Sequence, residues 1–304
     1  MFFEPDWATP ENILRLARSA REAEFDSVWL HDHVVTPKEL QHLDAPPMFD
    51  SLITTATIAA QVPEITVGIA AVILPLRDPV MLAKQVMTLE QYFPGRIVIG
   101  VGVGRYETEF EGFGSDLFRQ RGRVANEYLE IIETLFTESP ATYRGNFRSI
   151  AEAVFHPKPD ATHQPQIWVA GDSAAAARRA RRFGSTWIIS PAVDPEAVAA
   201  LMNRDGEGGG PEGAARFPIA LTTTIVPPSS PKANQGHDEH RLHQHGTVLA
   251  GDPETVAERI NDYIKAGIVH VLLAYRCEDI DAVETGMAWF NEKVRPRLAA
   301  AATV

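Results

Sequence analysis

TVGIAAVILPLRDPVMLAKQVMTLEQYFPGRIVIGVGVGRYE, residues 66–107, is the stretch that decides the fold of this chain. Its first part, 66–74, is a continuous apolar run, which is typical of a strand buried on both faces. Asp78-Pro79 then starts a helix, because aspartate is a good N-cap and proline is favoured at the first helical position. After Gly95, residues 96–101 form a second apolar run. Strand, helix and strand with short connections make the unit of a parallel sheet.

Three glycines mark the end of the second strand: Gly100, Gly102 and Gly104. Because side chains alternate along a strand, all three are expected on one face, which leaves room for a flat ring against the backbone. Close helix packing or a bend in a barrel would explain the same pattern. A Rossmann fingerprint starting at Gly100 needs glycine at its sixth place, where this chain has Arg105. Dinucleotide binding of that kind is therefore disfavoured.

The alternation of strand and helix patterns continues along the chain and predicts the fold class. Seven apolar runs are predicted strands, and Met1 to Phe3 is a doubtful eighth, cut short before Pro5. This favours an α/β fold, a (β/α)8 TIM barrel, over a doubly wound open sheet. We expect a single barrel domain spanning 1–304, with insertions and a reduced first strand. The glycine-rich and polar segment near 203–246 is expected to be a mobile insertion.

Composition narrows the classes of function. A formal net charge of −12 argues against nucleic acid as a partner, since binding to phosphates needs concentrated lysine and arginine. Cys277 is the only cysteine, which excludes an intramolecular disulfide and a cysteine zinc site and fits a reducing cytoplasm. The sequence shows neither a signal peptide nor an apolar stretch of about twenty residues, so we expect a cytoplasmic protein with no membrane partner.

The active site of a (β/α)8 barrel lies at the carboxyl ends of its strands, which selects the residues that carry chemistry. His31-Asp32-His33 ends one strand, and there an imidazole could move a proton near neutral pH while a carboxylate orients a heterocyclic N–H. A buried histidine bonded to backbone would look the same. Gly171-Asp172-Ser173 opens a helix whose free N–H groups could bind a phosphate, or it is an ordinary N-cap. We also expect His31 and Arg105 to contact a bound small molecule, the substrate.

Four histidines crowd a polar loop, at positions 237, 240, 243 and 245. Such spacing can bind a metal, but no cysteine or firm helix fixes the geometry, so a mobile lid or linker is favoured and no metal site is assigned.

Several ordered motifs together carry a resemblance to a known family: EFDSVWLHDH, VILPLRDPVMLAKQ, GRIVIGVGVG, HPKP with IWVAGDSAAAARRA, and AGDPETVAERI. The chain resembles the bacterial luciferase-like oxidoreductases over roughly residues 11–292, and most closely the branch that uses the deazaflavin coenzyme F420. Flavin (FMN) monooxygenases share this barrel and remain the alternative. The resemblance implies a small-molecule substrate, a homodimer and, for the FMN alternative, a partner reductase.

The resemblance also implies roles for individual residues. Asp32 would touch the cofactor, and His33 would be the catalytic acid or base facing the substrate. A bulge with a cis non-proline peptide bond, expected at Ala71-Val72, would support the ring. The remaining residues implied in cofactor binding are Leu74 with the following Pro75 at the ring's edge, Gly102 and Gly104 under the ring, and Gly171, Asp172 and Ser173 at the phosphate.

Departures from the family pattern refine the expected function. Arg105 stands where related sugar-phosphate dehydrogenases carry a glutamate, and Pro37 stands where they carry an aromatic residue, which argues against a sugar-phosphate substrate. The near absence of the first strand predicts either a late start of the chain or an unusual completion of the barrel. We expect an F420-dependent oxidoreductase that transfers a hydride to or from a small organic substrate. The rivals are an FMN-dependent monooxygenase using molecular oxygen and a flavin-binding protein without turnover.

Overall fold

The computed structural model describes residues 8–41, 48–183, 186–190, 194–198, 217–228, 230 and 248–299. These residues form two compact units, Phe25–Ala170 and the remainder, Met1–Glu24 with Gly171–Val304. The expected first strand at 1–3 and the histidines between 237 and 245 lie outside the described residues, as does most of the insertion expected near 203–246.

The unit Phe25–Ala170 is built on four parallel strands in the order β1-β2-β3-β6. The strands are β1 (Ser27–Leu30), β2 (Thr66–Ile73), β3 (Ile97–Gly102) and β6 (Gln166–Ala170). Their apolar runs are buried as the sequence predicts, with Ile69, Val72 and Ile99 at 1% exposure or less. Strands of this kind place their carboxyl ends at one edge, which positions the residues described below.

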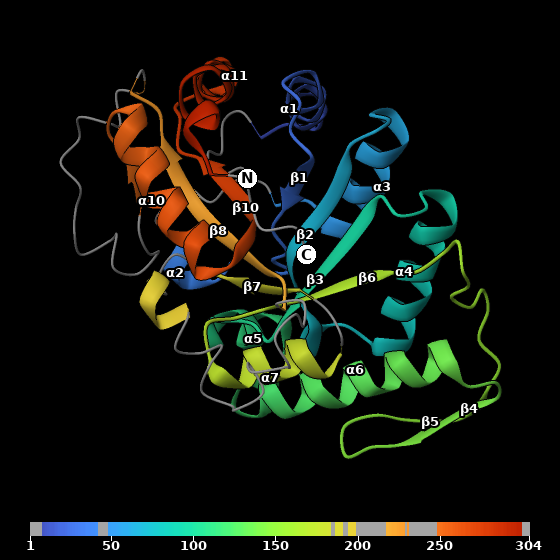
Figure 1. The fold of residues 1–304 in the computed structure, drawn as a ribbon. Coiled ribbons are helices and arrows are strands. Elements are labelled where there is room, and N and C mark those ends of the chain that lie inside the picture. The colour runs from blue at the N-terminus through green and yellow to red at the C-terminus, as the bar shows by residue number, and fades with distance from the viewer. Residues whose placement is uncertain are drawn as a thin grey trace, which may run out of the picture. The chain divides into compact units, whose positions relative to one another are not determined.

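Helices and short turns connect these strands. The helices are α2 (Lys38–Gln41), α3 (Ser51–Gln61), α4 (Pro79–Tyr92), α5 (Glu107–Phe113) and α6 (Arg121–Thr137), with 3₁₀ turns η1 (Leu74–Leu76) and η2 (Phe118–Gln120). Asp78 caps α4 as predicted, since its carboxylate accepts hydrogen bonds from the N–H groups of Val80 and Met81. Helices α4 and α6 pack side by side (Figure 1).

Residues 140–165 contain an antiparallel hairpin of β4 (Ala141–Arg144) and β5 (Ser149–Ala153). The buried Glu127 carboxylate of α6 accepts hydrogen bonds from the N–H groups of Asn146, Phe147 and Arg148, each at 2.7 Å. One helix side chain therefore satisfies the backbone of the hairpin turn, a contact between residues far apart in sequence.

The second unit has parallel strands β7 (Trp187–Ile189), β8 (Ile219–Val226), β9 (Val248–Ala250) and β10 (Ile268–Tyr275). β8 pairs with β10, with β7 at its first residues and with β9 at its last. Its helices are α1 (Pro10–Glu22), α7 (Ala174–Arg182), α10 (Pro253–Ala266) and α11 (Ile280–Trp289), the last continued by η4 (Phe290–Val294) and η5 (Arg295–Arg297). α1 and α11 lie side by side.

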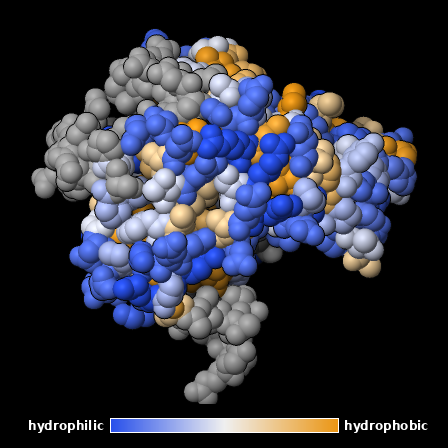
Figure 2. All heavy atoms as spheres, turned by 90° about the horizontal axis from the view of Figure 1, so that it is seen from above, coloured by the Kyte–Doolittle hydropathy of each residue, from blue (hydrophilic) through white to orange (hydrophobic). Residues whose placement is uncertain are grey.

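The face in Figure 2 carries mainly hydrophilic residues, with apolar residues scattered among them. Within the described ranges, no helix combines the length and the apolar character needed to cross a lipid bilayer.

Candidate active site

Asp32 follows β1 and is one of the few buried carboxylates, at 4% exposure. Its Oδ1 accepts hydrogen bonds from Ser51 Oγ at 2.8 Å and Arg77 Nη2 at 2.5 Å. Its Oδ2 accepts from the Ile73 N–H at 3.1 Å and Arg77 Nε at 3.3 Å. A carboxylate offers about four acceptor positions, so these four donors saturate it. Asp32 therefore fixes the end of β1 to the end of β2 and the start of α3.

Arg77 bridges two carboxylates. Besides Asp32, its Nη1 lies 3.3 Å from Oδ2 of Asp50, the residue that caps α3. The side chains of Arg77 and Asp32 are 15% and 2% exposed, whereas that of Asp50 is 40% exposed. Burial disfavours the charged guanidinium, but the hydrogen bond and the charge of Asp32 outweigh it and raise the pKa of Arg77 above its usual value. Arg77 is therefore a permanently charged and doubly paired cation.

His33 is held by a buried glutamate that the sequence analysis did not single out. Nδ1 of His33 lies 3.0 Å from Oε2 of Glu109, whose side chain is fully buried in α5. The Val34 N–H donates to Oε1 of the same carboxylate at 3.1 Å. The His33 ring also lies 6.2 Å from the ring of Tyr106. The predicted acid or base thus has a fixed position and only 18% exposure of its side chain.

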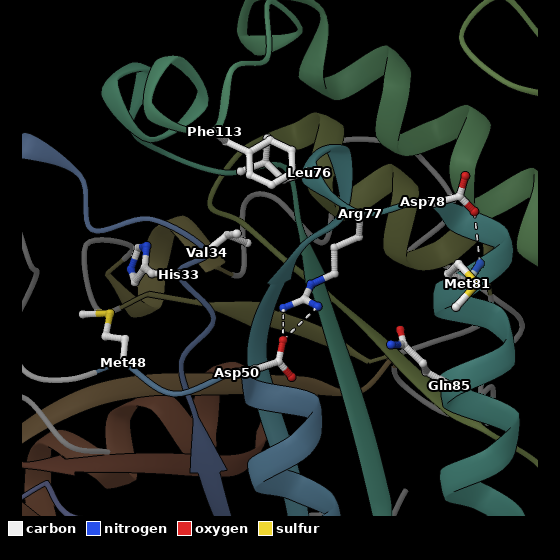
Figure 3. A pocket seen from close by; sticks show the side chains of 10 residues that line it. All are labelled: His33, Val34, Met48, Asp50, Leu76, Arg77, Asp78, Met81, Gln85 and Phe113. Atoms are coloured by element: carbon white, nitrogen blue, oxygen red, sulfur yellow. Dashed lines mark hydrogen bonds and ion pairs between the residues drawn. The ribbon is translucent and has the colours of Figure 1, made fainter.

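His33 lines a cavity of about 340 Å³. Figure 3 shows His33 and Met48 on one side, Asp78, Met81 and Gln85 from the start of α4 on the other, and Arg77 reaching down between them to Asp50. The remaining lining residues are apolar: Val34, Leu76 and Phe113. Polar and apolar side chains therefore share the lining, and a small organic molecule that carries polar groups fits this combination.

The predicted bulge in β2 is present, but the cis peptide bond is Ala70-Ala71 and the prediction of Ala71-Val72 is wrong by one residue. β2 pairs Ile69 with Ile99 and Val72 with Val101, so the strand has one extra residue between these pairs. Val72 is paired with Val101 in the regular parallel ladder and is fully buried. The irregular bond must therefore precede it.

The two glycines expected under a ring differ from each other. Gly102 ends β3, and a Cβ there would meet only Ala71 Cβ at 3.4 Å and Ala170 Cβ at 3.9 Å. Gly102 and Ala170 are the last residues of β3 and β6, and Ala71 lies in the bulge of β2, two residues before its end. The three residues belong to neighbouring strands, are only partly buried, and leave a surface almost bare of side chains. Gly104 lies beyond the strand at φ +80°, where a Cβ would come within 2.7 Å of the Phe110 ring. The expectation that all three glycines share one bare face is wrong for Gly104, because the strand alternation stops at Gly102.

Three other residues predicted to belong to the site, Leu74, His31 and Arg105, are not among the residues that line the cavity. Leu74 is fully buried in η1, and its neighbour Leu76 lines the cavity instead. Burial lowers the pKa of His31 to about 3, so this imidazole is neutral, and it is not among the cavity residues. Arg105 is exposed, with its guanidinium 5.8 Å from the Tyr106 ring, and is also absent from the cavity lining. The substrate roles of His31 and Arg105 stay predictions.

Gly171, Asp172 and Ser173 belong to the second unit and open α7. Ser173 caps the helix by accepting from the Ala176 N–H at 3.2 Å. Asp172 accepts from the N–H and the Oγ of Ser190, at 2.8 and 2.6 Å. An ordinary helix cap explains these contacts of Asp172 and Ser173. Binding of a phosphate by Gly171, Asp172 and Ser173 stays a prediction.

Sequence reasoning missed Glu109 and gave Arg77 no role. Glu109 lies in a short helix whose one clear signal is Gly114, the left-handed residue after its last turn. Among the described residues, no cluster of histidine, cysteine, aspartate and glutamate could hold a metal ion.

Comparison with known proteins places this geometry in a family. The family model described as luciferase-like monooxygenase matches residues 4–244. An F420-dependent glucose-6-phosphate dehydrogenase of Amycolatopsis mediterranei is 24% identical over 96% of this chain and 95% of its own length. The structure of an F420-dependent secondary alcohol dehydrogenase with an F420-acetone adduct has a TM-score of 0.78 at 20% identity, covering 99% of this chain and all of that one.

A third similar protein represents the FMN alternative. The oxygenating constituent of a diketocamphane monooxygenase of Pseudomonas putida, solved with FMN, has a TM-score of 0.71 at 18% identity, covering 99% and 100% of the two chains. These likenesses confirm the predicted fold class, a luciferase-like α/β TIM barrel. With 241 of its 304 residues inside the match from residue 4 to residue 244, the chain belongs to the luciferase-like monooxygenase family.

Proposed function

We propose that this protein is a coenzyme F420-dependent oxidoreductase, in which a hydride passes between the deazaflavin and a small organic substrate. The observation that carries the proposal is His33, a proton-transfer group that is fixed by Glu109 and lines a cavity of mixed polar and apolar residues. The relatives named as F420-dependent support the choice of cofactor.

The residues at the strand ends suit a flat ring. Gly102, Ala71 and Ala170 offer the bare surface for it, and Asp32 holds the surrounding strand ends together. When bound, the deazaflavin supplies hydride transfer at its ring. The chain's own part is to orient the ring and to hold or move a proton at His33. Asp32, Val72, Leu74 and Gly104 stay proposed cofactor-binding residues, and Gly171, Asp172 and Ser173 stay the proposed phosphate site.

An FMN-dependent monooxygenase that receives reduced flavin from a partner reductase is the second candidate. The name of the matching family and the FMN-bound structural relative favour it. The same cavity would hold the substrate of such a reaction.

Titration of the purified full-length protein with F420 and with FMN, followed by cofactor fluorescence, separates the two candidates. We expect saturable binding of F420 and weak or no binding of FMN. Tight FMN binding with none of F420 would replace the proposal by the monooxygenase. His33→Ala is expected to bind F420 as the wild type does and to lose turnover. Unchanged turnover in this variant would refute the catalytic role of His33, and absence of turnover in both proteins would favour a binding protein.

Assembly and location complete the proposal. The family resemblance suggests a homodimer, which light scattering during gel filtration tests directly. A cytoplasmic location is supported by the single cysteine, since Cys277 fits a reducing compartment.

A further inference from the structure

Glu109 contacts two successive residues of the segment that follows β1. Its Oε1 accepts the Val34 N–H at 3.1 Å, and its Oε2 lies 3.0 Å from Nδ1 of His33. The side chain is fully buried, whereas most glutamates are exposed. One buried carboxylate therefore fixes both the backbone and the imidazole at this point.

The helix that carries Glu109 is itself anchored. Phe110 is fully buried and packs with Ile73 and Leu76, the residues at the end of β2 and in η1. Thr108 Oγ1 accepts from the Lys38 N–H at 3.2 Å, which ties α5 to the start of α2. The position of the carboxylate relative to His33 thus depends on packing around it and not on a flexible side chain alone.

The hydrogen bonds of Glu109 constrain the protonation of His33. An ionised carboxylate only accepts, so the ring nitrogen that faces it must carry a proton. Nδ1 of His33 is that nitrogen. In the neutral ring the other nitrogen, Nε2, then has a free lone pair, because a neutral imidazole carries one proton. The geometry selects one of the two tautomers.

The other ionisable groups around His33 do not compete with this effect. Across the cavity, Arg77 is paired with Asp32 and Asp50, and Asp78 is paired with Arg148 at 3.1 Å. Burial raises the pKa of Tyr106, and burial lowers the pKa of His31 to about 3, so both rings are neutral near pH 7. Glu109 is the carboxylate that contacts the His33 ring in the part of the chain that the structure describes.

We propose that Glu109 is a positioning residue for His33. It holds the proton on Nδ1, leaves Nε2 as the atom that accepts a proton, and stabilises the imidazolium once that proton has arrived. In the reverse step Nε2 returns the proton to the bound molecule. The inference rests on the proposed role of His33 in proton transfer, but its structural content can be tested without cofactor or substrate.

The test is nitrogen NMR of the full-length protein labelled with ¹⁵N-histidine, with His33 assigned by comparison with His33→Ala. We expect the wild type to show the proton on Nδ1 at neutral pH. Glu109→Gln still offers an oxygen to the Val34 N–H, and its amide then turns N–H toward the ring, so the proton of His33 should move to Nε2.

Glu111→Gln is the matched control, since Glu111 lies on the same helix, is exposed, and the substitution removes the same charge. It should leave the tautomer of His33 unchanged. A proton on Nε2 in the wild type would overturn the proposal even if Glu109→Gln failed to fold, and so would an unchanged tautomer in a folded Glu109→Gln. The F420 titration is independent, so failure of cofactor binding with the expected tautomer switch would refute the proposed function alone.

Discussion

Two arginines of this protein bind carboxylates at nearly the same distances in opposite surroundings. Arg77 lies 2.5 Å from Asp32, and the two side chains are 15% and 2% exposed. Arg15 lies 2.6 Å from Asp281 and 2.5 Å from Glu284, with the three side chains 45%, 77% and 26% exposed. Water solvates both members of an exposed pair when it opens, whereas a buried charge that loses its partner stays desolvated. The distances therefore do not tell which ion pair contributes more to the free energy of unfolding, whereas the burial of the side chains does.

Arg77→Met breaks the buried network and should have the largest effect. It removes two of the four donors to Asp32 and leaves that carboxylate without a cation inside the unit. Breaking a buried pair in this way costs about 3 to 5 kcal/mol of unfolding free energy. Urea denaturation at pH 7 measures it. A loss no greater than that in Arg15→Met would show that the Asp32 site is effectively solvated.

The double variant Asp32→Asn with Arg77→Met should lose less stability than the two single variants together. Once the carboxylate is neutral, the missing guanidinium leaves no buried charge behind. We expect a coupling free energy of about 1 to 3 kcal/mol, measured by a complete double-mutant cycle of urea denaturations. Additive losses would mean that the two side chains act through packing and not through their charges. The same cycle on Arg15 and Glu284 is the exposed reference and should show the smaller coupling.

Local structure could be predicted from the sequence, whereas contacts between distant segments could not. The β2-α4-β3 unit was predicted to within about two residues at each end, because its signals are local: continuous apolar runs and the Asp78-Pro79 cap. The Glu109–His33 contact was not predicted, since the two residues lie 76 positions apart and α5 is a seven-residue helix without a clear apolar period.

The candidate site was predicted where strand geometry continues and missed where it changes. Asp32 and His33 were singled out because they end a strand, but the saturation of Asp32 by Ser51, Ile73 and Arg77 depends on three later segments. Gly104 was misplaced because the alternation of a strand was extended beyond Gly102. Local patterns thus locate the ends of strands, and only the packed structure shows what those ends bind.

Glu90 is a third buried carboxylate to compare, and in the described part of the chain it pairs with neither lysine nor arginine. It is 1% exposed and accepts from the Gly95 N–H at 2.9 Å. Burial raises its pKa, so the folded state binds a proton more readily than the unfolded state. Its contribution to stability is favourable at low pH and is lost as the pH rises through the folded pKa.

Glu90→Gln should therefore stabilise the protein, by roughly 1 kcal/mol at pH 8, since the amide keeps an acceptor for Gly95 and carries no charge. The gain should shrink as the pH falls toward 4.5, where the wild-type carboxylate is protonated in the folded state. Urea denaturation at several pH values measures this. A gain that does not depend on pH would assign the effect to packing rather than to titration.

Arg15→Met removes the exposed ion pairs and should have the smallest effect on the free energy of unfolding. Hydrogen bonds that Arg15 donates to Glu284 and Asp281 raise the pKa of Arg15. These bonds join solvated side chains, which lose rotamer freedom when they are held in one geometry. We expect a slight shift of the urea midpoint at low ionic strength and none at 1 M salt, where the screening length is about 3 Å. Arg77→Met should keep nearly its full effect at 1 M salt, because salt does not reach the buried pair. An equal salt dependence in both variants would place the Asp32–Arg77 pair in contact with solvent, and burial would no longer explain why the two arginines differ.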